Sequence, residues 1–240
     1  MKINRRNFLQ ATAASLALSS LQFPAHAASA APGKLKIGIV GSGRVGGTLG
    51  EVWAKAGHAV MFSSLDLAHD KALAARVGPN ARAGTQREAA AFGEVLLVSV
   101  PYHALPAVGK DLGALLKGKV VIDTCNPFLE RDGEVGKWAQ EKGAGLASAE
   151  LLPGARIVRA FNAVGYMRMA DAAKREPRAG MPMAGDDSKA IAVVSGLVRD
   201  IGFEPVVIGS LAMGRHLVPR QPLAGERTPD EIRRIAATLN

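Results

Sequence analysis

Three glycines with a fixed spacing are the residues of this chain best suited to hold a ligand. Gly41, Gly43 and Gly46 form the pattern GxGxxG in GSGRVG, which directly follows the apolar run KIGIV and precedes the helical pattern GTLGEVWAKAG. In this setting the first glycine permits a tight turn, the second lets the backbone approach a pyrophosphate, and the third lets helix and strand pack closely. The helix start attracts phosphates through its free N–H groups. We therefore expect a dinucleotide pyrophosphate to be bound by Gly41, Ser42, Gly43, Arg44, Val45 and Gly46.

The end of the next apolar run indicates which dinucleotide is bound. In NAD-binding versions of the motif an acidic residue stands there and bonds the ribose 2′-hydroxyl. Here the chain reads Phe62-Ser63-Ser64-Leu65, and the nearest acid is Asp66. Two hydroxyls would accept a 2′-phosphate more readily than a carboxylate, because like charges repel. We expect Ser63 and Ser64 to contact the cofactor, NADP to be preferred with NAD as the alternative, and Arg44 to pair with the phosphate.

A sheet must position these residues, and the chain alternates short β-branched runs with longer helical patterns. Strands are expected at 35–40, 58–63, 94–100, 119–124, 155–161, 181–185 and 204–209, and helices at 46–56, 67–77, 86–91, 104–116, 146–152, 164–173, 187–201 and 229–239. Such alternation is typical of βαβ units. It predicts an α/β Rossmann fold with a doubly wound, mostly parallel sheet, in a single domain over residues 34–240 that ends in a helical tail.

From residue 35 to about 219, the order of motifs resembles the NADP oxidoreductases that depend on coenzyme F-420, a deazaflavin, and the related NADPH domains of metalloreductases. The matching segments are KIGIVGSGRVG, Ser63-Ser64, VSVPYHAL (98–105), VVIDTCNPF (120–128), RIVRAFNAV (156–164), AGDD (184–187) and IGFEPVVIGSL (201–211). Members of this family commonly carry an arginine after the serine of the second strand, where it grips the 2′-phosphate. This chain has Leu65 there instead.

The resemblance implies that successive strand ends contact the ribose and nicotinamide, at Ser99, Val100, Pro101, Asn126, Pro127 and Asn162. This agrees with the rule that ligands bind at the carboxyl ends of strands in open α/β sheets. The acceptor is expected over the nicotinamide, in a cleft bounded by Pro101, Tyr102, Asn126, Phe128 and Asn162. Catalytic candidates are His103, Asn126 and Asn162, although hydride transfer needs stacking and orientation more than a strong acid or base.

Other reactive side chains have simpler explanations. Cys125 has no histidine near it in sequence and fits a small core residue. Asp186 and Asp187 precede a helix and fit a cap. His216 in the C-terminal segment is a weaker candidate for reaching the site. No Cys/His spacing resembles a metal site, so none is expected.

The first 27 residues predict a removable leader. A charged segment with Arg5-Arg6, a weakly apolar stretch and the triplet Ala25-His26-Ala27 make up a signal peptide, and the arginine pair followed by Phe8-Leu9 resembles the twin-arginine type. We expect a periplasmic protein with no membrane span after the leader is removed, the alternative being an ordinary Sec signal.

Composition narrows the partners. The formal charge of +9 comes from 30 basic and 21 acidic residues, but the basic residues are scattered without aromatic interleaving, so no nucleic acid is expected. The expected function is hydride transfer between NADP and a flavin-like, deazaflavin-like or small carbonyl or imine acceptor. The alternative is a non-catalytic protein that retains its dinucleotide. A homo-oligomer is compatible with either.

Overall fold

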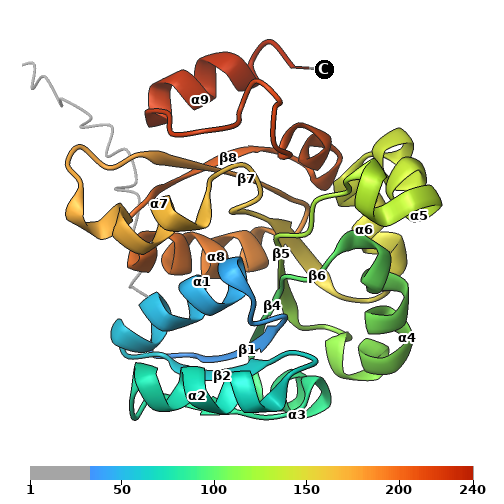
Figure 1. The fold of residues 1–240 in the computed structure, drawn as a ribbon. Coiled ribbons are helices and arrows are strands. Elements are labelled where there is room, and N and C mark those ends of the chain that lie inside the picture. Colours follow the sequence, from blue (N-terminus) through green and yellow to red (C-terminus); the bar gives the residue numbers. More distant parts are fainter. Residues whose placement is uncertain (1–32, 240) are drawn as a thin grey trace, which may run out of the picture. The chain divides into compact units, whose positions relative to one another are not determined.

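The computed structural model describes residues 33–239, and in that range eight strands form one sheet. Their spatial order is β3-β2-β1-β4-β5-β6-β7-β8 (Figure 1). The strands are β1 (Lys36–Val40), β2 (Ala59–Ser63), β3 (Ala81–Ala83), β4 (Val95–Val98), β5 (Val120–Asp123), β6 (Arg156–Arg159), β7 (Gly180–Gly185) and β8 (Glu204–Gly209). The order reverses between β1 and β4, which is the switch point where open α/β sheets bind ligands. The predicted Rossmann fold is confirmed.

One strand pair departs from the parallel pattern. Six strands that are consecutive in space run parallel to one another: β3, β2, β1, β4, β5 and β6. Strand β7 pairs with β6 in the antiparallel direction, and β8 then pairs with β7 in parallel. The carboxyl ends of β1, β2, β4, β5 and β6 therefore meet at one edge of the sheet.

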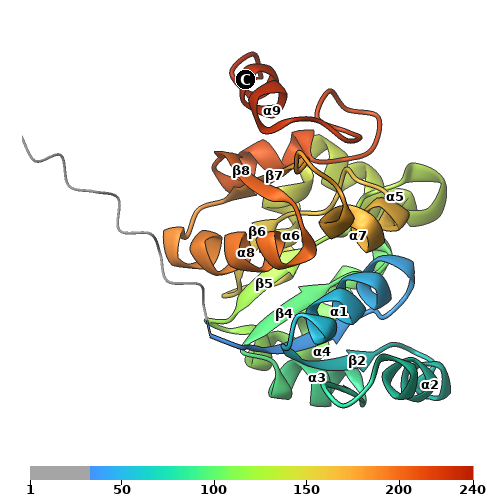
Figure 2. The same ribbon diagram turned by 90° about the vertical axis from the view of Figure 1, so that its left-hand side faces the viewer.

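The helices cover both faces of the sheet. They are α1 (Arg44–Lys55), α2 (Leu67–Val77), α3 (Gln86–Phe92), α4 (Leu105–Leu116), α5 (Leu129–Lys142), α6 (Ala144–Leu151), α7 (Tyr166–Asp171), α8 (Ser188–Ile201) and α9 (Pro229–Ala236), with short 3₁₀ turns η1 (Tyr102–Ala104), η2 (Ala172–Lys174) and η3 (Leu211–His216). Figure 2 shows α1 and α8 side by side along the sheet, and Figure 1 shows α4, α5 and α6 on the opposite side from α1.

Alternation along the strands divides the core between these faces. Ile39 of β1 and Leu97 of β4 belong to a cluster with Trp53 of α1, whereas Val40 and Leu96 belong to a second cluster with helices α4 to α6. Successive side chains of a strand point to opposite faces, so nearly continuous apolar runs supply both layers. The sheet edge that carries the site is thus fixed from two sides.

Two elements were missing from the sequence prediction. Strand β3 has only three residues, Ala-Arg-Ala, without a β-branched side chain that would mark it. Helix α5 contains Gly133 and Gly136, and the backbone at Gly133 (φ 53°) breaks its regular geometry. Glycines and a mostly polar composition removed the periodicity that predicts helices. This helix matters because it adjoins the expected acceptor cleft.

No helix within residues 33–239 is long and apolar enough to cross a membrane. The predicted leader, residues 1–27, lies outside the described part of the chain.

Candidate functional site

The turn between β1 and α1 is built around glycines that the protein itself requires. Gly41 has a φ of 101°, and its N–H donates to the carbonyl of Ser63 at 2.9 Å. A Cβ at Gly41 would overlap the carbonyl of Ser99, and one at Gly46 would overlap the carbonyl of Gly41. Both glycines therefore permit close approaches of backbone to backbone, as the motif predicts.

Gly43 is different, because no atom in residues 33–239 explains it. Its φ is −69°, and a Cβ there would meet no atom of this described part within 4 Å. Gly43 is the N-cap of α1 and gives no side-chain cap, and the first turn contains no acidic residue. The helix start thus presents uncapped N–H groups beside an open space. This arrangement fits the pyrophosphate of a dinucleotide.

Ser63 supports the glycine turn from below. Its hydroxyl donates to the carbonyl of Ile39 at 2.6 Å, and its own carbonyl accepts from Gly41 and from Ser42. The side chain is fully buried. Ser63 therefore contributes to the predicted cofactor site by fixing the loop, and its hydroxyl is directed into the sheet.

A carboxylate that sequence reasoning missed lies at the same strand end. Asp70, in the first turn of α2, is fully buried and accepts hydrogen bonds from the hydroxyls of Ser42 and Ser64, the latter at 2.9 Å. Asp66, the nearest acid in sequence, instead caps α2 by accepting from the N–H of His69 at 2.9 Å. A cap at residue 66 places position 70 one helical turn later, and that spacing was the signal available.

The ends of β5 and β6 bring two predicted asparagines together. The Nδ2 atom of Asn126 donates to the carbonyl of Asn162 at 2.8 Å, and Nδ2 of Asn162 donates to the carbonyl of Asp123 at 3.1 Å. Phe161, just before Asn162, has a φ of 65°, a conformation that costs energy for a phenylalanine. Nearby, Ser99 and Val100 are half-buried and Pro101 is exposed at the end of β4, while Pro127 is buried.

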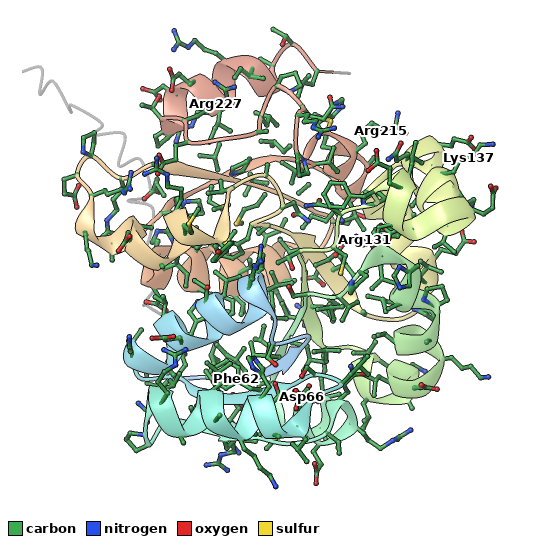
Figure 3. The ribbon with its side chains drawn as sticks, viewed as in Figure 1. Phe62, Asp66, Arg131, Lys137, Arg215 and Arg227 are labelled. Atoms are coloured by element: carbon green, nitrogen blue, oxygen red, sulfur yellow. The ribbon has the colours of Figure 1, made fainter. Side chains whose placement is uncertain are left out.

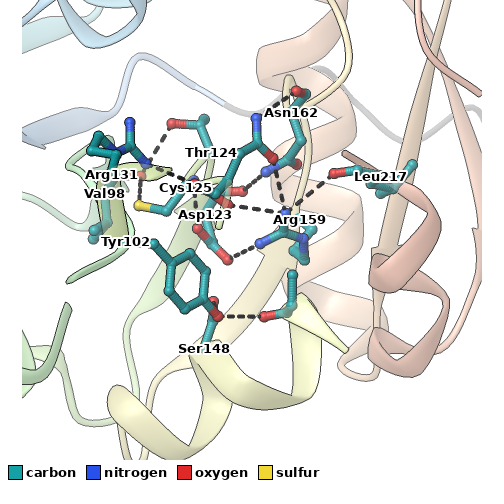
Figure 4. A network of polar contacts seen from close by, with 12 residues as sticks. Val98, Tyr102, Asp123, Thr124, Cys125, Arg131, Ser148, Arg159, Asn162 and Leu217 are labelled. Carbon is teal, nitrogen blue, oxygen red and sulfur yellow. Dashed lines mark hydrogen bonds and ion pairs between the residues drawn. The ribbon is translucent and has the colours of Figure 1, made fainter. Parts of the chain in front are cut away.

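A buried ion pair underlies these strand ends (Figure 4). Nη1 of Arg159 lies 2.5 Å from Oδ2 of Asp123, and Nη2 of Arg159 donates to the carbonyls of Cys125 at 3.0 Å and Leu217 at 3.2 Å. Arg159 therefore joins β5, β6 and the segment after η3. In the sequence, Asp123 and Arg159 stand out only as charged residues within apolar runs. Their pairing across two strands has no local signal.

His103, a catalytic candidate from the sequence, is engaged by a carboxylate. Its Nδ1 is 2.8 Å from Oδ1 of Asp132, and its side chain is half-exposed. Asp132 also accepts from Arg131 and from the N–H of Phe128. Burial raises the pKa of Asp132, but the bonds from Arg131, Phe128 and His103 outweigh burial and hold that pKa well below its usual range. The group connects η1 to the start of α5.

Tyr102 does not border the cleft as expected. Its ring is fully buried among the core residues under α4, and its hydroxyl bonds the carbonyl of Ala144 at 2.9 Å and the hydroxyl of Ser148 at 3.0 Å. Tyr102 is the first residue of η1, directly after the exposed Pro101, and this turn directs its ring into the core. This part of the prediction was wrong.

Two further side chains have the structural roles expected for them. Cys125 is buried, and burial followed by the charge of Asp123 raises the pKa of its thiol well above the usual value. Asp187 caps α8 by accepting from the N–H of Ala190 at 2.8 Å, and its bonds to Arg156 hold its pKa well below the usual range. No group of three potential metal-ligating side chains was found in residues 33–239.

Two cavities adjoin residues expected to contact the cofactor, one at the glycine turn and one after the end of β5. One of about 370 Å³ opens beside the glycine turn and is lined by Gly43, Arg44, His69, Arg76 and Tyr166, among others. Another of about 420 Å³ begins at Pro127 and Phe128 and extends to Arg215 and Arg220. It shares Phe128, Gln140 and Arg220 with a neighbouring cavity that also contacts Arg131. Figure 3 places Arg131 and Arg215 on the side of the molecule formed by α5 and η3.

A strand, an uncapped glycine turn and a helix at the switch point of a doubly wound sheet define a dinucleotide-binding Rossmann protein. Residues 36–127 match the model of the family described as NADP oxidoreductase, coenzyme F420-dependent. The resemblance seen in the motifs is thereby confirmed, and over these residues the chain is similar to NADP-dependent oxidoreductases.

Individual proteins show the same similarity. The metalloreductase STEAP3 of Rattus norvegicus is 29% identical over 199 residues, which is 81% of this chain but only 38% of that protein. A hypothetical protein from Sinorhizobium meliloti superposes with a TM-score of 0.67 and 24% identity, covering 80% of this chain and 93% of the other. A protein from Arthrobacter assigned as an F420-dependent NADP-reductase gives 0.61 and 19%, covering 75% and 87%. At these identities the structures establish the fold.

Proposed function

We propose that this protein transfers a hydride between NADP(H) and a planar, anionic acceptor of the flavin or deazaflavin kind. The observation that carries this proposal is the cavity of about 420 Å³, whose lining begins one residue after Asn126 in the chain and combines the ring of Phe128 with two arginines. A bound nicotinamide would supply or accept the hydride. The chain's own residues would bind, orient and desolvate the two rings.

The strand ends supply orientation. Asn126 and Asn162 bond each other, and Arg159 holds the carbonyl of Cys125 immediately before Asn126. These bonds fix the backbone that would carry the nicotinamide. Preorganised amides can hold a ring in a single pose without exchanging a proton, which suits direct hydride transfer.

The acceptor side combines an exposed ring with positive charge. Phe128 is 43% exposed, and the guanidinium of Arg131 lies 4.9 Å from the centre of its ring. Arg220, which lines the same cavity, has a φ of 70°, a strained conformation of the kind found where side chains are held for binding. Glu130 is the acidic residue in the lining of the adjoining cavity. The excess of arginines suits a phosphate or carboxylate on the acceptor.

The arrangement favours a flavin-like acceptor over a carbonyl or imine. Reduction of a carbonyl needs a proton as well as a hydride, and His103 is not among the residues that line the cavity or its neighbour. Tyr102, the other candidate donor in the VSVPYHAL motif, is buried, and burial and the charge of Asp123 raise its pKa. A flavin ring accepts a hydride at one atom and needs no protein acid in the same step.

The decisive experiment compares FMN with riboflavin, which differ only in the phosphate. We expect FMN to support NADPH oxidation, which is measured as the loss of NADPH absorbance. Arg220→Ala should raise the KM for FMN about tenfold and change the KM for riboflavin little. Lys137→Ala, an exposed cation on α5, is the matched control and should change neither. Faster oxidation with a simple imine or ketone than with any flavin or deazaflavin would overturn the proposal.

The asparagines are tested in the same assay. Asn126→Ala and Asn162→Ala should slow turnover while leaving the affinity for NADP much the same, because the phosphate contacts lie at the glycine turn. Unaltered turnover in both variants would remove them from the site.

We further propose that the protein is exported to the periplasm through the twin-arginine route, with its cofactor already bound. The pair Arg5-Arg6 supports this proposal. Folded export solves the supply of a dinucleotide that is made in the cytoplasm.

A further inference from the structure

The buried carboxylate of Asp70 stands out because hydroxyl groups surround it. It is fully shielded from solvent and accepts from Ser42 and Ser64, and no lysine or arginine in residues 33–239 forms an ion pair with it. A buried carboxylate usually has a cationic partner, since burial of a charge is costly. The remaining support for Asp70 comes from its position in the first turn of α2.

Its location gives this charge a functional context. Ser42 belongs to the glycine turn, and Ser64 follows the last residue of β2. In this fold the adenosine ribose lies between these two segments, with its 2′-position toward the end of the second strand. Asp70, which accepts from both serines, would therefore lie next to the place where NADP carries a phosphate and NAD carries a hydroxyl.

Two physical effects follow at this position. Each serine has one hydroxyl proton, and when that proton is donated to Asp70 the oxygen can only accept. The N–H of Asp66 already donates to Ser64 Oγ at 3.1 Å. A 2′-phosphate needs donors, so both hydroxyls are committed away from it. The negative charge of Asp70 also repels a phosphate through a region from which water is excluded.

The neighbouring residues only partly offset this charge. Leu65 is 98% exposed and brings no cation to the strand end. Arg76, in the adjacent cavity, is paired with Glu51 at 2.9 Å. Arg44 belongs to the GSGRVG segment itself, and its guanidinium stacks on Tyr166, 5.9 Å from the ring centre.

We propose that Asp70, acting through the hydroxyls of Ser42 and Ser64, sets the preference between NADP(H) and NAD(H) by weakening the binding of the 2′-phosphate. The inference rests on the proposed binding of NADP(H) at the glycine turn. The native chain then prefers NADP(H) over NAD(H) only modestly, and removal of the charge of Asp70 strengthens this preference.

The test uses two ligands that differ only in the phosphate, adenosine 2′,5′-bisphosphate and 5′-AMP, titrated calorimetrically against the full chain. Asp70→Asn should raise the affinity for the bisphosphate relative to 5′-AMP by about tenfold, because one charge is removed and a hydroxyl proton is released. The ratio of the two affinities cancels any general loss of folded protein. Asp66→Asn removes the same charge from an exposed position nearby and should leave the ratio nearly unchanged.

A double-mutant cycle locates the effect. In a Ser64→Ala background, Asp70→Asn should lose much of its gain, because the released hydroxyl is absent. An unchanged ratio in Asp70→Asn, or an equal shift in Asp66→Asn, would overturn the proposal. The unmodified chain provides a further test, which no folding defect of a variant can affect. If it binds the bisphosphate more than about a hundredfold more tightly than 5′-AMP, Asp70 does not repel the 2′-phosphate and the proposal is wrong.

These outcomes are separable from those of the proposed function. Absence of flavin reduction by a chain that binds both nucleotides would contradict the acceptor while leaving the role of Asp70 intact. Absence of binding to either nucleotide would remove the cofactor site itself and this inference with it.

Discussion

Arg159 and Asp123 form an ion pair, 2.5 Å between Nη1 and Oδ2, in which neither side chain is exposed to solvent. The pair bridges the ends of β5 and β6, where the predicted nicotinamide contacts lie. A buried pair of this kind contributes little when both partners are present, but removal of one partner leaves a charge in a medium that cannot solvate it. Its main effect is to fix the geometry of the strand ends.

Arg159→Met should therefore destabilise the protein strongly. We expect a loss of about 3 kcal/mol in the free energy of unfolding, measured by urea denaturation. The matched control is Arg156→Met on the same strand, whose partly exposed pair with Asp187 should contribute about 1 kcal/mol or less. Equal losses in the two variants would contradict the assignment. The double variant Asp123→Asn, Arg159→Met should lose less than the sum of its single changes.

The glycine turn allows binding to be separated from folding. Gly43→Val should reduce NADP affinity at least about tenfold, since its side chain enters the space beside the helix start, while stability changes by about 1 kcal/mol or less. Gly41→Ala should instead unfold the turn, because its φ is positive and a Cβ overlaps Ser99. Calorimetric titration and thermal unfolding measure the two effects. Wild-type NADP affinity in Gly43→Val would exclude the pyrophosphate from this turn.

Arg44 should account for part of the selectivity for the 2′-phosphate. We expect NADP(H) to bind more tightly than NAD(H), and Arg44→Ala to narrow the difference by about 1 kcal/mol through loss of one charge-assisted contact. Arg76→Ala is a suitable comparison, because this residue lines the same cavity but is paired with Glu51. If NAD(H) binds as tightly as NADP(H) to the unmodified chain, the predicted preference is wrong.

Asp132 should make stability depend on pH in the acid range. Its folded pKa lies below the ordinary value, so its stabilising effect is fully present above about pH 4 and is lost as the pH falls further. Asp132→Asn should lower the free energy of unfolding by about 2 kcal/mol at pH 7, with a difference that shrinks toward pH 3. Glu134→Gln, an exposed change on α5, serves as the control. A constant difference across this range would show that the carboxylate has no such role.

The export proposal makes a prediction about two residues outside the described structure. Replacement of Arg5 and Arg6 by lysine should leave the precursor in the cytoplasm, because the twin-arginine pathway reads the guanidinium pair and not only its charge. Cell fractionation measures this. Normal periplasmic accumulation would indicate a Sec signal.

The sequence was sufficient for features whose cause is local. The glycine turn follows from backbone geometry, and the central strands follow from continuous apolar runs that are buried on both faces. The capping box of Thr85 and Glu88 was also predictable, since the spacing of the two residues specifies the bonds.

Features that depend on the folded chain were not predictable in this way. The direction of β7 has no local signature, because a strand presents the same alternation whichever way it runs. Asp70 meets Ser42 across 28 residues, and Arg159 meets Asp123 across 36. Both are charged residues whose partners are known only once the sheet is assembled. Tyr102 turned inward for the same reason, because its partners Ala144 and Ser148 lie on α6.

The bond from Arg159 to the carbonyl of Leu217 also constrains the order of events during synthesis. Arg159 leaves the ribosome 58 residues before its partner, so the guanidinium must wait for the C-terminal segment before all of these contacts exist. A nascent chain stalled before Leu217 holds an incompletely bonded charge at the carboxyl ends of β5 and β6. The strand ends therefore gain their full set of hydrogen bonds only after the chain has been synthesised past Leu217.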